Sequence, residues 1–157
     1  MPATSKIEQF WNDYLLTLPE RSRQQNYYEA ATWGNSPELA DRIAHLIRSG
    51  IKTTTSALLW DQQQKQWPME KPGDKSIVLD SHHNPICITE TLDVFIKPFN
   101  EVDAGFVYRY GEGDRSMAFW NKNMWEYYQT ECLALGKTAQ PDMPMICVVF
   151  KRIYPAA

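Results

Sequence analysis

A helix with well-defined ends that runs directly into a β-branched segment constrains the fold more than any other feature of this chain. Ser36 is placed as the N-cap of this helix, with Pro37 at its first position and Glu38 in the first turn. Gly50 is placed to end the helix in a left-handed conformation. Residues 51–60 then begin with β-branched side chains, which favours a strand. The sequence therefore predicts a helix and a strand that follow each other without a linker.

Apolar periodicity and turn-forming residues predict the remaining elements. Residues 4–17 and 117–135 carry apolar side chains at helical spacing. Strands are expected at residues 76–79, 86–96 and 144–154, separated by proline, glycine and asparagine. The resulting order, α-α-β-β-β-α-β, favours an α+β fold with a small β-barrel flanked by helices over a doubly wound sheet.

The length of 157 residues favours one hydrophobic core and a single main domain. We expect this domain at residues 27–157, with residues 1–26 forming a helix and connector packed on it. No apolar run approaches the roughly 20 residues that a membrane-spanning helix needs. The N-terminus also lacks the basic and apolar segments of a secretory signal, so a cytoplasmic location is expected.

The residues that most often bind metals show no ligand pattern. Cys87, Cys132 and Cys147 are widely spaced and form no Cys-x-x-Cys pair, which favours reduced, buried thiols. His82 and His83 lie beside Asn84 in a turn. We therefore expect neither a metal nor a cofactor.

The formal net charge of -3 and the pI of about 5.6 restrict how the protein could bind nucleic acid. Coating a nucleic acid by bulk electrostatics requires many contacts from lysine and arginine to phosphates. Any such contact here must therefore be local.

Three groups of segments, in this order and spacing over residues 27–154, resemble an ASCH domain. One of them contains a Gly-x-Lys-x-x-Thr turn directly after the predicted helix. The groups are residues 33–41 with 49–55, residues 72–74 with 88–91 and 98–103, and residues 111–116 with the helix that follows.

The resemblance implies a PUA-like β-barrel with helices around a cleft, in a family whose relatives bind RNA or act on nucleosides. Some members are similar to ribonucleases that act on single-stranded RNA. Others are similar to amidohydrolases that deacylate acetylcytidine, and one eukaryotic branch is similar to transcriptional coactivators. The fold alone does not choose among these functions.

The resemblance also implies a catalytic group of Lys52, Thr55 and Glu112. In the amidohydrolase-like members, the lysine of Lys-x-x-Thr assists attack by the threonine hydroxyl. Lysine can accept that proton only if burial lowers its pKa toward neutrality. Residues three apart on a regular strand face opposite sides, so Lys52 and Thr55 can converge only at a turn or bulge. Glu112, between two glycines, is the expected carboxylate.

Several neighbouring residues are alternatives for these roles. Thr53, Thr54 and Ser56 are rival hydroxyl groups, and the same run is also explained by β-propensity alone. Asp114 or Glu90 could replace Glu112 as the carboxylate. Asp114 could equally cap the helix that follows it.

Aromatic and polar side chains near the lysine turn are candidate substrate contacts, together with Thr53, Ser56 and Asp114. Trp33 lies beside Gly34 and Asn35 in a predicted loop, where an aromatic ring could stack on an unpaired base. Arg115 could contact a phosphate or form a salt bridge.

The leading prediction is metal-independent cleavage of single-stranded RNA, with Lys52 as the electrostatic or acid-base group. The alternatives are an amidohydrolase that acts on an acylated cytosine nucleoside, with Thr55 as nucleophile, and a non-catalytic module that binds RNA. The expected partner is accordingly single-stranded RNA or a modified nucleoside.

Overall fold

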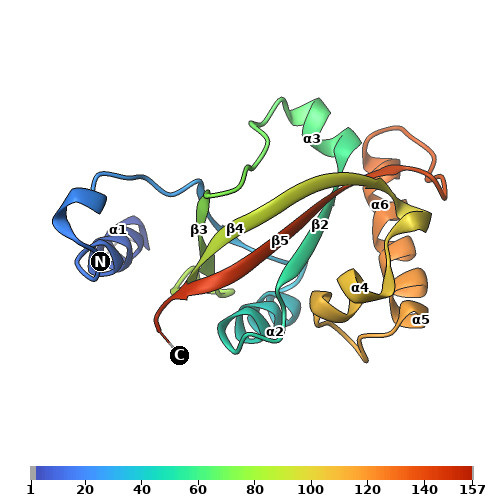
Figure 1. The fold of residues 1–157 in the computed structure, drawn as a ribbon. Helices are drawn as coiled ribbons and strands as arrows, with labels where there is room; N and C mark the ends of the chain where they lie inside the picture. The colour runs from blue at the N-terminus through green and yellow to red at the C-terminus, as the bar shows by residue number, and fades with distance from the viewer. Residues whose placement is uncertain (1–2, 157) are drawn as a thin grey trace.

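A curled five-stranded sheet forms the centre of the protein, for which a computed structural model describes residues 3–156. The strand order is β1-β3-β4-β5-β2; β1 pairs in parallel with β3, and the other pairs are antiparallel. The strands are β1 (Glu29–Thr32), β2 (Thr54–Leu58), β3 (Lys75–Leu79), β4 (Pro85–Pro98) and β5 (Pro144–Tyr154). The sheet is a half-barrel, since β1 and β2 form its two edges (Figure 1).

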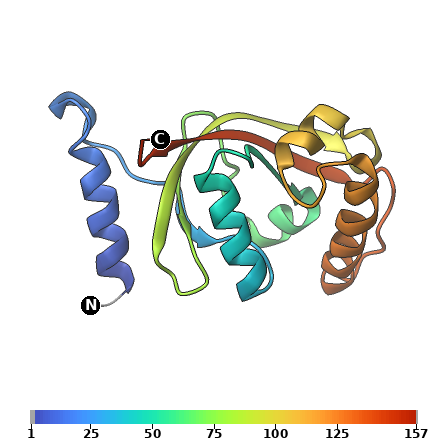
Figure 2. The same ribbon diagram turned by 90° about the horizontal axis from the view of Figure 1, so that it is seen from below.

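Helices surround this sheet on several sides, which confirms the expected α+β, PUA-like fold. Figures 1 and 2 place α1 at one end of the sheet, α6 at the opposite end and α2 between them. The helices are α1 (Ala3–Leu15), α2 (Pro37–Arg48), α3 (Leu59–Lys65), α4 (Ala104–Tyr110), α5 (Met117–Phe119) and α6 (Trp125–Ala134). Shorter helical turns are η1 (Glu20–Ser22), η2 (Phe99–Glu101) and the π-helical η3 (Trp120–Met124).

The ends of α2 follow the sequence prediction. The Ser36 hydroxyl oxygen accepts a hydrogen bond from the Leu39 amide at 3.2 Å, and Pro37 is the first helical residue. Gly50 takes a left-handed conformation with φ of +84° after the helix ends. Sequence alone thus located this helix.

The strand after α2 is shorter than predicted. β2 begins at Thr54, and Trp60 lies in α3 rather than in the strand, so the expected strand at residues 51–60 was too long. The backbone amides of Ile51 and Lys52 both bond to the Leu46 carbonyl, which keeps the chain at the end of α2 instead of in the sheet. Tertiary pairing, not β-propensity, sets where this strand begins.

Besides α3, the strand β1 and the helix α4 were not predicted from the sequence. β1 contains alanine and glutamate, which have low strand propensity, and it forms because it pairs with β3. α4 begins where the Asp103 side chain accepts a hydrogen bond from the Phe106 amide at 2.8 Å. The predicted helix at residues 117–135 is confirmed as α5, η3 and α6 in succession.

The N-terminal helix α1 packs against the sheet through aromatic residues. Trp11 and Tyr14 are buried and form one cluster with Ile77, Leu79 and Ile88. The Trp11 indole also donates a hydrogen bond to the Gln25 carbonyl at 3.3 Å.

Two further observations concern membranes and metals. None of the helices within residues 3–156 has the length and apolar character needed to cross a membrane. Over the same residues, no three histidine, cysteine, aspartate or glutamate side chains lie close enough together to hold a metal ion.

Trp11→Ala is expected to lower the free energy of unfolding by about 3 to 5 kcal/mol, because it leaves a cavity between α1 and the sheet. Denaturant titration followed by circular dichroism measures this change. Leu16→Ala is the matched control, since Leu16 is 66% exposed, and should change stability by less than about 0.5 kcal/mol. Equal effects of the two substitutions would contradict the packing of α1.

Candidate functional site

A cavity of about 550 Å³ surrounds the lysine turn, and we call it the lysine cavity. Its walls come from α2 and the loop before it, from the Lys52 segment and β2, from the end of α4 and the turn after it, and from the α5–α6 helical segment. Its lining includes Trp33, Asn35, Arg42, Lys52, Thr55, Ser56, Tyr110, Glu112, Glu126 and Tyr127.

Lys52 reaches this cavity because it precedes the strand. The backbone of residues 51–53 links α2 to β2 without regular structure, and the Thr53 amide bonds to the Arg109 carbonyl at 2.8 Å. Alternation along a regular strand therefore does not apply between Lys52 and Thr55. Both residues line the lysine cavity, as the predicted convergence required.

The Lys52 ammonium group is removed from water, with 1% of the residue exposed. Its Nζ lies 2.8 Å from Glu112 Oε2 and donates a hydrogen bond to the Tyr110 carbonyl at 3.2 Å. It also lies 3.2 Å from the centroid of the Tyr110 ring. The carbonyl belongs to the last turn of α4, where the helix dipole favours a positive charge.

Burial lowers the pKa of Lys52 from 10.5 to about 8, although the Glu112 carboxylate opposes this shift. The difference corresponds to about 3 kcal/mol by which the fold favours the neutral amine. Burial and the Glu112 charge also raise the pKa of the Tyr110 hydroxyl, which keeps that group protonated. The site therefore contains an amine that can exchange a proton near neutral pH.

Gly111 brings Glu112 to Lys52. It has φ of +76° and ends α4, and a Cβ at this position would lie 2.9 Å from the Ile51 carbonyl oxygen and from Lys52 Cα. Only glycine allows the two chain segments to approach this closely. Gly113 is similarly constrained, because its Cβ would overlap the Phe119 ring.

The hydroxyl groups of the threonine run have different surroundings. Thr54 is buried, and its hydroxyl donates to the Phe106 carbonyl at 3.0 Å, so it links β2 to α4 within the core. Thr55 and Ser56 line the lysine cavity. Ser56 Oγ lies 2.7 Å from the Tyr128 hydroxyl, and the Thr55 and Ser56 side chains both interact with the Tyr110 hydroxyl.

The structure gathers most, but not all, of the sequence-derived candidates. Trp33 and Asn35 line the lysine cavity together with the expected catalytic group. Three of the candidate substrate contacts do not line it, namely Thr53, Asp114 and Arg115.

These remaining candidates have other contacts. Asp114 bonds to Ser116, which lowers the pKa of its carboxyl group, while Ser116 itself caps α5. Arg115 donates to the Tyr108 carbonyl, and its guanidinium stacks 3.6 Å from the Tyr108 ring centroid. Glu90 lies on β4, 3.6 Å from Lys75, outside the lysine cavity.

Sequence reasoning missed the tyrosines of the site. Tyr110 provides both a carbonyl and a ring face to Lys52, and Tyr128 holds Ser56. Both are buried, so their apolar periodicity resembles that of ordinary core residues. The nearest sequence clue is the position of Tyr110 directly before Gly111.

A curled half-barrel with a polar cavity beside one edge strand defines a PUA-like α+β domain. The sequence profile of the ASCH domain matches residues 29–154. The chain therefore belongs to the ASCH domain family.

Solved structures share this fold. The crystal structure of an ASCH domain from Lactobacillus crispatus JV V101 has a TM-score of 0.90 and 27% sequence identity, with 94% of each chain covered. Protein EF3133 from Enterococcus faecalis V583 has a TM-score of 0.86 and 24% identity, covering 96% of this chain and 89% of that chain. At that identity the second likeness shows the fold alone. The comparison with curated proteins gave no match.

Gly111→Ala is expected to destabilise the protein by about 3 kcal/mol or more, because it combines a left-handed backbone with overlap against Lys52. Gly136→Ala is the matched control, since Gly136 has φ of +71° but no atom within 4 Å of its Cβ position. It should cost only about 1 to 2 kcal/mol of backbone strain. Denaturant titration compares them, and equal losses would contradict the close approach.

Lys52 should also make stability depend on pH. Its pKa is about 8 in the folded chain against 10.5 for an ordinary lysine. Between these values the unfolded chain retains a proton that the folded chain releases, so raising the pH favours folding. Well below pH 8 Lys52 is protonated in both states, so its contribution to the free energy of unfolding no longer changes with pH.

We therefore expect the free energy of unfolding of the wild type to rise by about 2 kcal/mol relative to that of Lys52→Met between pH 8 and pH 10. Urea titrations at several pH values measure it. Burial raises the pKa of Cys87 and Tyr128, which oppose this trend in both proteins and cancel in the difference. A difference that is constant with pH would show that Lys52 titrates normally.

Proposed function

We propose that the protein is an amidohydrolase that removes an acyl group from a small nucleoside such as acetylcytidine. The observation that carries the proposal is the buried Lys52–Glu112 pair at 2.8 Å, in one cavity with the Thr55 hydroxyl. An amine with a pKa of about 8 can accept a proton near neutral pH and return it later.

In the proposed reaction, neutral Lys52 accepts the Thr55 hydroxyl proton as Thr55 Oγ1 attacks the amide carbonyl carbon. The C–N bond then breaks, and Lys52 returns the proton to the leaving nitrogen. Water attacks the resulting acyl ester while Lys52 accepts a water proton. The ester C–O bond then breaks, Lys52 returns the proton to Thr55 Oγ1, and the acyl group leaves as a carboxylic acid. Glu112 orients Lys52 and stabilises its protonated form.

The charges of the cavity favour a neutral substrate over a phosphodiester. Two cations, Lys52 and Arg42, and two carboxylates, Glu112 and Glu126, line the lysine cavity. Lys52 already pairs with Glu112, so little positive charge remains for phosphate groups. The volume of about 550 Å³ falls within the range usual for small-molecule sites.

Ribonuclease activity on single-stranded RNA is the second candidate. Trp33 is a half-buried residue that lines the cavity, so it could stack on an unpaired base, and Arg42 could contact one phosphate. Lys52 would then stabilise the charge that develops at phosphorus. RNA binding without turnover is the third possibility, and the same assays distinguish all three.

Purified protein in EDTA is expected to release cytidine from acetylcytidine, with kcat/KM rising with pH to a plateau above about pH 8. Lys52→Ala and Thr55→Val should each lower kcat by about a hundredfold or more, since each removes a reacting group. Thr138→Val removes an exposed hydroxyl outside the cavity and should retain activity. Chromatography of the nucleosides measures release.

A fluorescent single-stranded RNA is tested in parallel. If the wild type but not Lys52→Ala cleaves the RNA, and no cytidine is released from acetylcytidine, the protein is a ribonuclease and not an amidohydrolase. Binding of RNA with no turnover of either substrate would leave the binding module. An unchanged Lys52→Ala variant would remove the catalytic assignment altogether.

A further inference from the structure

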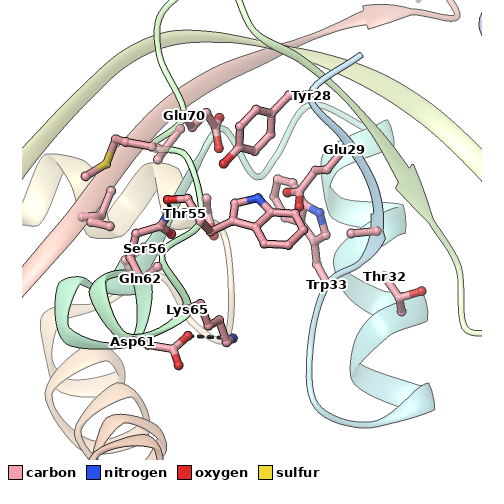
Figure 3. Close-up of a pocket in the computed structure, with 16 residues that line it drawn as sticks. Tyr28, Glu29, Thr32, Trp33, Thr55, Ser56, Asp61, Gln62, Lys65 and Glu70 are labelled. Atoms are coloured by element: carbon pink, nitrogen blue, oxygen red, sulfur yellow. Dashed lines mark hydrogen bonds and ion pairs between the residues drawn. The ribbon is translucent and has the colours of Figure 1, made fainter. Parts of the chain in front are cut away.

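A second cavity, of about 560 Å³, lies on the other side of Trp33, Thr55 and Ser56, which line both cavities. We call it the tryptophan cavity. Its walls are the edge strands β1 and β2, helix α3 and the loop that contains Trp67 and Glu70 (Figure 3). The two cavities therefore adjoin along the open edge of the half-barrel.

Flat aromatic side chains form much of the wall of the tryptophan cavity. Tyr28, Trp33 and Trp67 line it, and Trp67 remains 55% exposed. The loop of Trp67 is held in place, because Gln62 Nε2 donates to the Trp67 carbonyl at 2.7 Å and the Tyr28 hydroxyl donates to the Pro68 carbonyl. A large indole is thus kept partly in water beside a preformed hollow.

Glu29 and Glu70 add two carboxylates without a cationic partner. No ion pair to either residue occurs among residues 3–156, whereas Asp61, in the same cavity, pairs with Lys65 at 2.8 Å. The Thr91 hydroxyl donates to Glu70 Oε2. Figure 3 shows Glu29 and Glu70 near Tyr28. Burial raises the pKa of both carboxyl groups, and the charge of Glu70 adds to the shift at Glu29. The ionised carboxylates are therefore destabilised, and a bound cation would stabilise them.

We propose that the tryptophan cavity is a binding site for a planar organic cation of the guanidinium type, held between the aromatic rings and the carboxylates of Glu29 and Glu70. A guanidinium stacks on aromatic faces and donates paired hydrogen bonds to carboxylates. Both kinds of partner line this one hollow. The site does not depend on the hydrolysis proposed for the lysine cavity.

The choice of a cation follows from the chemistry of the lining. Carboxylates accept hydrogen bonds but donate none, so they select a ligand rich in N–H donors. The cavity has three acidic residues and Lys65 as its one basic residue among the described lining, and Lys65 is already paired. An anionic or phosphate-bearing group would therefore be repelled.

Isothermal titration of the intact chain with butylguanidinium tests the proposal, with butylurea as the neutral ligand of the same shape. Butylguanidinium should bind one equivalent about tenfold or more tightly than butylurea, because only it carries charge to the carboxylates. Glu29→Gln and Glu70→Gln should each weaken butylguanidinium binding about fivefold or more. Trp67→Leu should weaken it about threefold or more by removing an aromatic face.

Glu38→Gln is the matched control, since Glu38 is an exposed carboxylate outside the cavity, and it should leave the affinity unchanged. Thermal melting of each variant confirms that it is folded. Equal binding of butylurea, or a butylguanidinium affinity that neither glutamate substitution alters, would overturn the proposal. The titration contains no nucleoside, so its failure would be distinct from a failure of the proposed hydrolysis.

Discussion

Burial of the Lys52 ammonium group is the constraint on which the site depends. A cation out of water is stable only if charged and polar partners surround it, and removing one partner leaves an uncompensated charge. Glu112 and the Tyr110 carbonyl supply those partners. They can reach Lys52 only because α4 ends at Gly111, whose missing side chain admits the lysine backbone. The sequence of α4, Gly111 and Glu112 is therefore what allows the Lys52 ammonium group to be buried with a charged partner.

The open edge of the sheet explains where the cavities lie. A closed barrel would pair β1 with β2, whereas here the two strands form opposite edges of the described sheet. Trp33, which directly follows β1, and Thr55 and Ser56 of β2 line both cavities. The same opening thus accommodates both proposed sites, the hydrolytic site on one side and the cation site on the other. Ligands that bridge both sides would contact Trp33.

The geometry also changes the order of the functional hypotheses. Sequence analysis favoured cleavage of RNA because the family resemblance and aromatic content both point to nucleic acids. Inside the fold, however, the Lys52 charge is matched by Glu112, and the adjoining cavity adds Glu29 and Glu70. A phosphodiester gains little from such a surface, whereas a neutral acylated nucleoside avoids the repulsion. The balance of buried charge cannot be counted from a sequence, because it depends on which side chains meet.

The sequence by itself determined the elements whose causes are local. Ser36, Pro37 and Gly50 set the ends of α2 through capping and backbone preference. The order and spacing of three groups of segments over residues 27–154 indicated the family. Only the tertiary structure decided that Tyr110 would contact the Lys52 ammonium group, that β1 would be a strand, and that Asp114 and Arg115 would lie outside the cavity. The first two outcomes follow from contacts between segments far apart in the chain, which leave no local pattern in composition or periodicity. Asp114 and Arg115 instead contact Ser116 and Tyr108 nearby in the chain, and only the path of the backbone around the cavity leaves them outside it.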